Sequence, residues 1–356
     1  MLMRMPAWRI PTTLCLLALS IVMLQAASHP ASSQPANPEP KPPVSVRLML
    51  DRPINATAAP FAVALSKGYF RAAGLNVTLA PGNNTNDAIA SVAEGRSDIA
   101  LADLNALIRF RDAANAPAVK AVFMLFNTAS YAIVARRSRG IDRLADLTGK
   151  TLGVAAGDLA IRLWPAVADR NGIKPGSVKQ QPIGAAVREP MLAAGQVDAV
   201  TGLSYLSAVN LRDHGIPADD LTVLRFADYG GEAYGAALIV NPQFAAQQPD
   251  AIRSFIRAVI AGLRLTLKEP ALAIDAVVAQ MNNGSRELEQ ERLRVLIHGD
   301  IATAEVKQNG FGAIDETRFN LALDQIAVDY KFRNRPSASD IFDAAFLPPL
   351  AERQLN

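Results

Sequence analysis

Residues 85–102, TNDAIASVAEGRSDIALA, contain the pattern that decides the fold. Apolar residues at helical spacing end at Gly95, and glycine commonly closes a helix because it tolerates a positive φ. Polar residues and Asp98 then lead into an apolar strand. The same succession of helix, glycine, aspartate and apolar strand returns over residues 186–201, AVREPMLAAGQVDAVT. The repetition predicts two similar αβ halves.

Short apolar segments alternate with amphipathic ones from residue 44 onward, which predicts an α/β protein with mainly parallel sheets flanked by helices. The expected strands are residues 46–50, 76–79, 99–102, 152–155 and 199–201. The expected helices are residues 60–70, 85–94, 159–171 and 186–194, followed after Pro242 by residues 249–267, 270–281, 287–297 and 315–330. We expect the last group to pack on the first half.

Two further apolar segments, residues 131–136 and 235–240, flank the second half and have the β-branched residues of strands. Their positions predict crossovers between two lobes. We expect lobe one to comprise residues 44–130 plus 235–349, and lobe two residues 131–234. A lobe that is assembled from both ends of a chain can open and close through a few hinge torsions.

The amino terminus predicts export. Residues 1–9 contain two arginines and no acid, residues 10–24 are almost entirely apolar, and Ala26-Ala27-Ser28 supplies small residues for cleavage. A membrane anchor is the alternative, but the apolar run is shorter than the ~20 residues that span a bilayer. We expect a signal peptide over residues 1–28, a flexible linker rich in Pro, Ser and Ala over residues 29–43, and a periplasmic mature protein.

The composition narrows the possible partners. Cleavage near Ser28 would remove Cys15, the one cysteine, and Cys15 lies in the apolar run after Leu14, where we expect no lipidation. The formal net charge of +3 falls to about +1 once Arg4 and Arg9 are removed. A nearly neutral chain without a basic stripe is not expected to bind nucleic acid.

Several motifs in fixed order carry a family resemblance. They are LSKGYF at residues 65–70, AGLNV at 73–77, GRSDIA at 95–100, LADLTGKTLGV at 144–154 and AAGQVDAV at 193–200. Together they resemble the nitrate, sulfonate and taurine type of periplasmic solute-binding proteins, which are related to the thiamine-pyrimidine precursor (NMT1/THI5-like) binding proteins. The resemblance spans residues 44–348. It implies a two-lobed type II periplasmic binding fold, a small-molecule ligand, an ABC permease in the inner membrane as partner, and a monomer.

Open α/β sheets bind ligands beyond the carboxyl ends of their strands, so the site should come from the loops there. The candidate ligand-binding residues are Asp51, Arg52, Asn55, Asn83, Asn84, Thr85, Asp103, Gly157, Asp158, Arg188, Thr201, Tyr229, Glu232 and Tyr234. Some of these have a structural alternative, because Asn84 and Asp158 precede helices and fit N-caps, and the tyrosines fit plain packing. For Tyr229 and Tyr234, we expect at least one to touch the ligand.

We expect a small solute with an anionic or strongly electronegative group, met by Arg52. A guanidinium can donate two parallel hydrogen bonds to a carboxylate, sulfonate or nitrate, and helix N-termini add N–H donors. Arg188 is the second candidate. The alternative is that Arg52 pairs with Asp51 and that Arg188 is a solvated residue beside Glu189.

Two other functions stay open at this point. The first is an enzyme of the same fold that acts on a pyrimidine or sulfur compound, using histidine and lysine or a cysteine nucleophile as its relatives do. Ala58 occupies the position where the pyrimidine group has a histidine, and the sequence predicts no catalytic residue, metal site or cofactor. The second is a sensor that presents its ligand to a membrane receptor.

Overall fold

The computed structural model describes residues 42–355, and they form two five-stranded sheets. The predicted signal peptide and nearly all of the predicted linker lie outside the described residues. The first sheet has the order β2-β1-β3-β10-β4, with β1 Val44–Met49, β2 Leu75–Ala80, β3 Ile99–Asp103, β4 Lys120–Met124 and β10 Ala236–Val240. The second has the order β7-β6-β8-β5-β9, with β5 Tyr131–Arg136, β6 Thr151–Ala155, β7 Lys179–Ile183, β8 Ala199–Leu203 and β9 Leu221–Arg225.

The two sheets repeat one topology. In the first, β2, β1 and β3 run parallel, and β10 lies antiparallel between β3 and β4. In the second, β7, β6 and β8 run parallel, and β5 lies antiparallel between β8 and β9. Four strands of each sheet therefore share a direction, which confirms the expected α/β fold with mainly parallel sheets.

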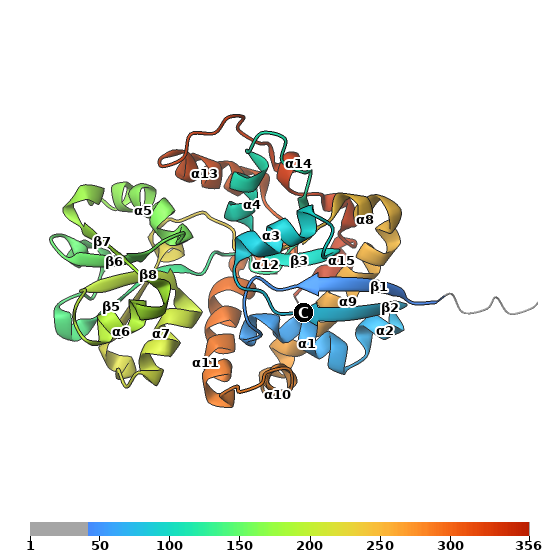
Figure 1. Cartoon of the computed structure of the whole chain (residues 1–356), viewed down its shortest axis with the longest axis horizontal. Helices are drawn as coiled ribbons and strands as arrows, with labels where there is room; N and C mark the ends of the chain where they lie inside the picture. The colour runs from blue at the N-terminus through green and yellow to red at the C-terminus, as the bar shows by residue number, and fades with distance from the viewer. Residues whose placement is uncertain (1–41, 356) are drawn as a thin grey trace, which may run out of the picture. The chain divides into compact units, whose positions relative to one another are not determined.

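Helices flank both sheets (Figure 1). Those of the first αβ unit are α1 Ala59–Ser66, α2 Tyr69–Ala72, α3 Thr85–Ala93 and α4 Leu104–Arg111, and those of the second are α5 Leu159–Arg170, α6 Arg188–Ala193 and α7 Ser204–Asp213. The carboxyl-terminal group comprises α8 Pro242–Gln247, α9 Pro249–Lys268, α10 Pro270–Val278, α11 Arg286–Leu296, α12 Ala304–Asn309, α13 Glu316–Ala327, α14 Ala338–Ile341 and α15 Leu350–Arg353.

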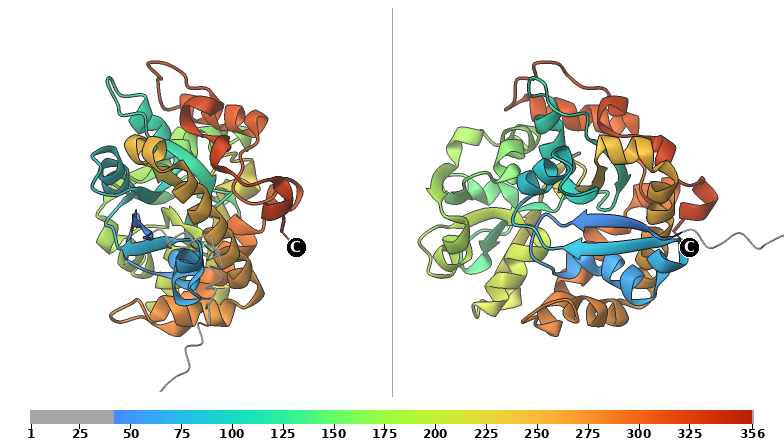
Figure 2. Two further views of the ribbon diagram at one scale, coloured as in Figure 1. Left: turned by 90° about the vertical axis from the view of Figure 1, so that its right-hand side faces the viewer. Right: turned by 45° about the vertical axis from the view of Figure 1, so that its right-hand side comes forward.

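The carboxyl-terminal helices pack against elements from the first half of the chain. The apolar stripe of α9 lies against α1 and α2, and the ring of its Phe255 stacks on Phe70 with centroids 5.0 Å apart. The three views agree that α14 lies beside α4 (Figures 1 and 2). Two helices also contact the second unit, because α11 packs on α7 and α13 on α5.

The two segments that join the sheets run side by side. The backbone N–H of Ala129 donates to the carbonyl of Ala233 at 3.0 Å, and that of Gly235 donates to Phe126, also at 3.0 Å. A Cβ on Gly235 would lie 2.7 Å from the carbonyl oxygen of Thr128, so glycine permits this close approach. The segments over residues 131–136 and 235–240, expected as crossovers, form strand β5 of the second sheet and strand β10 of the first, and the chain passes between the sheets just before each strand.

Several expected boundaries differ from the observed ones. The helix expected over residues 60–70 is divided, since α1 ends at Ser66, Gly68 has a φ of 71°, and α2 follows. The helix expected from residue 186 starts with a 3₁₀ turn over Ala185–Val187 and becomes α-helical at Arg188. Within residues 42–355, no helix is long and apolar enough to cross a membrane.

Candidate functional site

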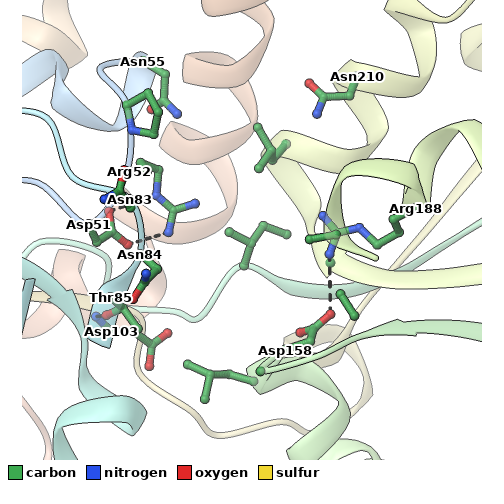
Figure 3. A pocket seen from close by; sticks show the side chains of 18 of the residues that line it. Asp51, Arg52, Asn55, Asn83, Asn84, Thr85, Asp103, Asp158, Arg188 and Asn210 are labelled. Carbon is green, nitrogen blue, oxygen red and sulfur yellow. Dashed lines mark hydrogen bonds and ion pairs between the residues drawn. The ribbon is translucent and has the colours of Figure 1, made fainter. Parts of the chain in front are cut away.

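A cavity of about 650 Å³ lies between residues of the two sheets, at the carboxyl ends of their parallel strands (Figure 3). Ten of the residues predicted from the sequence line it: Asp51, Arg52, Asn55, Asn83, Asn84, Thr85, Asp103, Gly157, Asp158 and Arg188. The loops after β1, β2 and β3 contribute one wall, and residues after β6 and at the start of α6 contribute the opposite one. The structure thus brings together loops that are far apart in the sequence.

Arg52 and Asp51 form a two-pronged ion pair in the loop after β1. The Nε of Arg52 donates to Oδ1 of Asp51 at 2.9 Å, and its Nη2 donates to Oδ2 at 2.5 Å. The Asp51 side chain is 3% exposed and that of Arg52 23% exposed, and Figure 3 shows the guanidinium of Arg52 turned toward the cavity. The ring of Tyr205 lies below it, with 5.8 Å between the guanidinium carbon and the ring centroid.

The loop before α3 is held tightly against the end of β1. A Cβ on Gly82 would lie 1.9 Å from the carbonyl oxygen of Leu50, so only glycine fits there. Asn84 caps α3 by accepting from the N–H of Asp87 at 3.0 Å, and the hydroxyl of Thr85 accepts from the N–H of Asp103 at 2.8 Å. These contacts position the loop and leave Asn83 and Asn84 facing the cavity.

The opposite wall has its own ion pair. Asp158 caps α5 by accepting from the N–H of Ala160 at 2.9 Å, and its other oxygen accepts from the Thr201 hydroxyl at 2.5 Å. Arg188 lies 3.6 Å from Asp158 and 3.1 Å from Glu189, measured between guanidinium nitrogens and carboxylate oxygens. Thr201 therefore supports Asp158 from behind and does not line the cavity.

Asp103 ends β3 and caps α4. Its Oδ1 accepts from the N–H of Asn105 at 2.8 Å and of Ala106 at 3.3 Å, and its Oδ2 accepts from the Tyr131 hydroxyl at 2.6 Å. Burial raises the pKa of Asp103 above its ordinary value, although these hydrogen bonds oppose the change. Burial also raises the pKa of Tyr131, which keeps its hydroxyl protonated as the donor.

The predicted residues of the return segment lie away from the cavity lining. Tyr234 is buried, and its hydroxyl donates to Glu305 at 2.9 Å and accepts from the N–H of Asp315 at 2.7 Å. Glu232 faces Arg318 at 3.8 Å between carboxylate oxygen and guanidinium nitrogen. The Tyr229 carbonyl accepts from Asn171. This segment contacts α5 and α13, so these residues pack against helices and do not line the cavity.

Several lining residues were not predicted: Tyr131, Leu206, Asn210, Met281, Glu289 and Arg292. On α11, Glu289 is 1% exposed, forms an ion pair with Arg292 and accepts from the N–H of Ala56 at 2.6 Å. Arg292 also donates to Asn210 of α7 at 2.8 Å. A Glu and an Arg three residues apart are typical of a solvated helix face, so the sequence contains no signal that assigns this pair to a site.

The lining of the described chain contains no histidine, cysteine or lysine. His214 lies at the end of α7, and the Nδ1 of His298 is 2.8 Å from the carbonyl oxygen of Arg294. Among residues 42–355, no group of three or more histidine, cysteine or carboxylate side chains could hold a metal ion. The geometry therefore offers hydrogen-bonding and charged groups around an aliphatic space.

Comparisons with known proteins agree with this architecture. The chain is 24% identical over 242 residues to the 4-amino-5-hydroxymethyl-2-methylpyrimidine phosphate synthase of Schizosaccharomyces pombe, covering 65% of this chain and 68% of that protein. It is 30% identical over 229 residues to the riboflavin-binding protein RibY of Chloroflexus aurantiacus, covering 62% of each and so less than two thirds of RibY. The structure of the periplasmic aliphatic sulphonate binding protein SsuA of Escherichia coli matches with a TM-score of 0.64 and 14% identity, over 88% of this chain and 92% of that one.

The structural match shows the fold, which is that of periplasmic binding proteins. Residues 55–273 match the sequence model of the family described as NMT1/THI5 like. The matched segment is more than half of the chain and runs from the loop after β1 into α10, in agreement with the resemblance of the sequence motifs. The protein therefore belongs to the NMT1/THI5-like family.

Proposed function

We propose that this protein is an extracytoplasmic solute-binding protein that captures a small molecule and delivers it to an ABC importer. The observation that carries the proposal is the cavity of about 650 Å³, lined by polar and charged side chains from both sheets. Its volume lies within the ~300–1,000 Å³ range of small-ligand sites. Aliphatic residues such as Ile54 and Leu203 supply the apolar surface that such sites need.

Capture involves movement of two lobes, residues 44–130 plus 235–349 and residues 131–234. The paired crossovers supply the hinge, since few residues join the two sheets and each crossover can change its torsions. Cross-cavity contacts such as that between Arg292 and Asn210 would form or break in this movement. A solute that touches both walls favours the closed arrangement because it binds that state more tightly.

Export and delivery complete the proposal. A signal peptide over residues 1–28 and a linker over residues 29–43 would place the mature monomer in the periplasm. SsuA of E. coli, whose structure is similar, is named a periplasmic protein. The partner is an inner-membrane permease. A sensor that presents the solute to a membrane receptor is the alternative, and neighbouring genes for a permease and an ATPase, or for a sensor kinase, distinguish the two.

The solute carries an anionic or electronegative group near Arg52. The guanidinium retains N–H groups beyond the two that bind Asp51, and it is partly exposed to the cavity. The amino ends of α3 and α5 border the same space, and helix amino ends favour negative charge. Arg188 would add a donor from the opposite wall.

An enzyme is the second candidate because one relative is named a pyrimidine phosphate synthase. Histidine and lysine chemistry has no counterpart among the described lining residues. The solute that copurifies with the protein, incubated with it for hours, should be recovered unchanged by chromatography and mass spectrometry. Conversion of the solute, with product formed in at least a one-to-one ratio to protein, would favour the enzyme instead.

A further inference from the structure

The ion pairs around the cavity leave one carboxylate of the described lining outside any pair. Arg52 pairs with Asp51, Arg188 with Asp158 and Glu189, and Arg292 with Glu289. Every arginine of the described lining is therefore matched by at least one acid. Asp103 is the remaining lining carboxylate, and none of the ion pairs found within residues 42–355 includes it.

All four hydrogen bonds to Asp103 come from neutral donors. Oδ1 accepts from two backbone N–H groups and from the Asn105 amide, whereas Oδ2 accepts only from the Tyr131 hydroxyl. A carboxylate oxygen has two lone pairs, so Oδ2 can accept one more hydrogen bond. Figure 3 shows the carboxylate turned toward the space between the two walls.

We propose that Asp103 determines specificity by holding a protonated amine of the solute. This inference rests on the proposed function and adds to it a solute class, an aliphatic molecule with an ammonium group. An ammonium would supply the missing positive charge and fill the open acceptor position of Oδ2. In a partly desolvated cavity, such a charged hydrogen bond is stronger than one from a neutral hydroxyl.

The walls beside Asp103 suit an aliphatic body. Ile54, Leu159, Leu203, Leu206 and Met281 line the cavity, and Tyr131 is the one aromatic residue among the described lining residues. Tyr131 is 2% exposed, so it presents little ring surface for stacking. Burial raises the pKa of Asp103, which is the direction expected of a carboxylate without a partner cation, and an ammonium would reverse it.

A purely structural role of Asp103 as helix cap is the competing explanation. Asparagine caps helices as well as aspartate does and is nearly the same size. Asp103→Asn therefore retains the cap through its amide oxygen and removes the charge, and its NH2 group takes the place of Oδ2 and donates to the Tyr131 hydroxyl. A purely structural role predicts that Asp103→Asn changes the affinity for every ligand to the same extent. The proposal predicts that only cationic ligands lose affinity.

The test uses three probes with one five-carbon chain: n-pentylamine, pentan-1-ol and pentanoate, titrated calorimetrically into the solute-free protein. We expect the amine to bind at least about tenfold more tightly than the alcohol. Asp103→Asn should weaken amine binding by about tenfold or more and leave alcohol binding unchanged. Asp315→Asn is the matched control, because Asp315 caps α13 outside the cavity and should leave all three affinities unchanged.

Equal affinities for amine and alcohol, failure of all three probes to bind, or equal losses for both in Asp103→Asn would overturn the inference. These outcomes differ from a failure of the proposed function. That function is tested by the copurified solute, which would still be bound and recovered unchanged if Asp103 were only a cap.

Discussion

Arg52 combines two roles at the scale of single residues. It neutralises the buried carboxylate of Asp51 through two hydrogen bonds, and its partly exposed guanidinium faces the cavity. Both alternatives that the sequence left open, ion pairing and a position at the site, are therefore compatible in one side chain.

Arg52→Ala is expected to weaken binding of the copurified solute by about 2–5 kcal/mol, because a desolvated charged hydrogen bond is lost. It should also lower the free energy of unfolding, since Asp51 stays buried without its cation. Calorimetric titration and denaturant unfolding measure the two effects. Arg96→Ala is the control, because the exposed pair of Arg96 with Glu94 is worth under about 1 kcal/mol. An unchanged affinity in Arg52→Ala would remove Arg52 from the site.

The residues that sequence reasoning found and missed differ in one physical respect. Asp51, Asn84 and Asp158 follow strands or begin helices, so their place at a sheet edge is set by local sequence. Glu289 and Asn210 reach the cavity because α11 packs on α7, a contact between segments far apart in the chain. Tertiary packing of this kind leaves no local pattern.

At the scale of elements, a π-helical turn over Ile297–Ile301 connects three parts of the chain. Its Asp300 is completely buried and accepts from the Ser130 hydroxyl at 2.5 Å and from Nη2 of Arg225 at 2.6 Å. Arg225 also donates to the carbonyl of Gly299 at 2.8 Å. The turn thereby ties β9 of the second sheet to the segment that precedes β5.

This turn should make stability depend on pH. Burial raises the pKa of Asp300 from 3.8 to about 6, so the folded state holds a proton that the unfolded state releases. The stability that this protonation contributes to the folded state is complete below about pH 4 and is lost as the pH rises through about 6. The loss in the free energy of unfolding is about 3 kcal/mol at most. The unfolding free energy of wild type minus that of Asp300→Asn should fall over this range. A difference that stays constant with pH would contradict the assignment.

The elements themselves were partly predictable. Strand β3 has an apolar, mostly buried sequence, β1 has buried residues in alternate positions, and β5 was predicted with its observed bounds. Strand β7, KQQPI, was missed because it is a polar edge strand that contains proline. Helix α4 was missed because its first residues were assigned to a binding loop. Asp103 does line the cavity, but it does so as the cap of that helix.

At the scale of the whole molecule, the proposed function requires one small molecule held between two similar αβ units. The repeated order of helix, glycine, aspartate and strand predicted the two units, and the two sheets share one topology. The identity of the solute was not predictable from the sequence. The cavity lining combines loops and helices that are far apart in the chain and that only tertiary packing brings together. The cavity's matched ion pairs and its one unmatched carboxylate emerge only at this scale.

Native mass spectrometry of the protein purified without refolding from a periplasmic extract tests the central claim most directly. We expect one small molecule bound per chain, released intact when the protein is denatured, and rebound when it is added back to the emptied protein. A chain that carries no small molecule and binds none from the extract, or one that returns a chemically altered compound, would contradict the account.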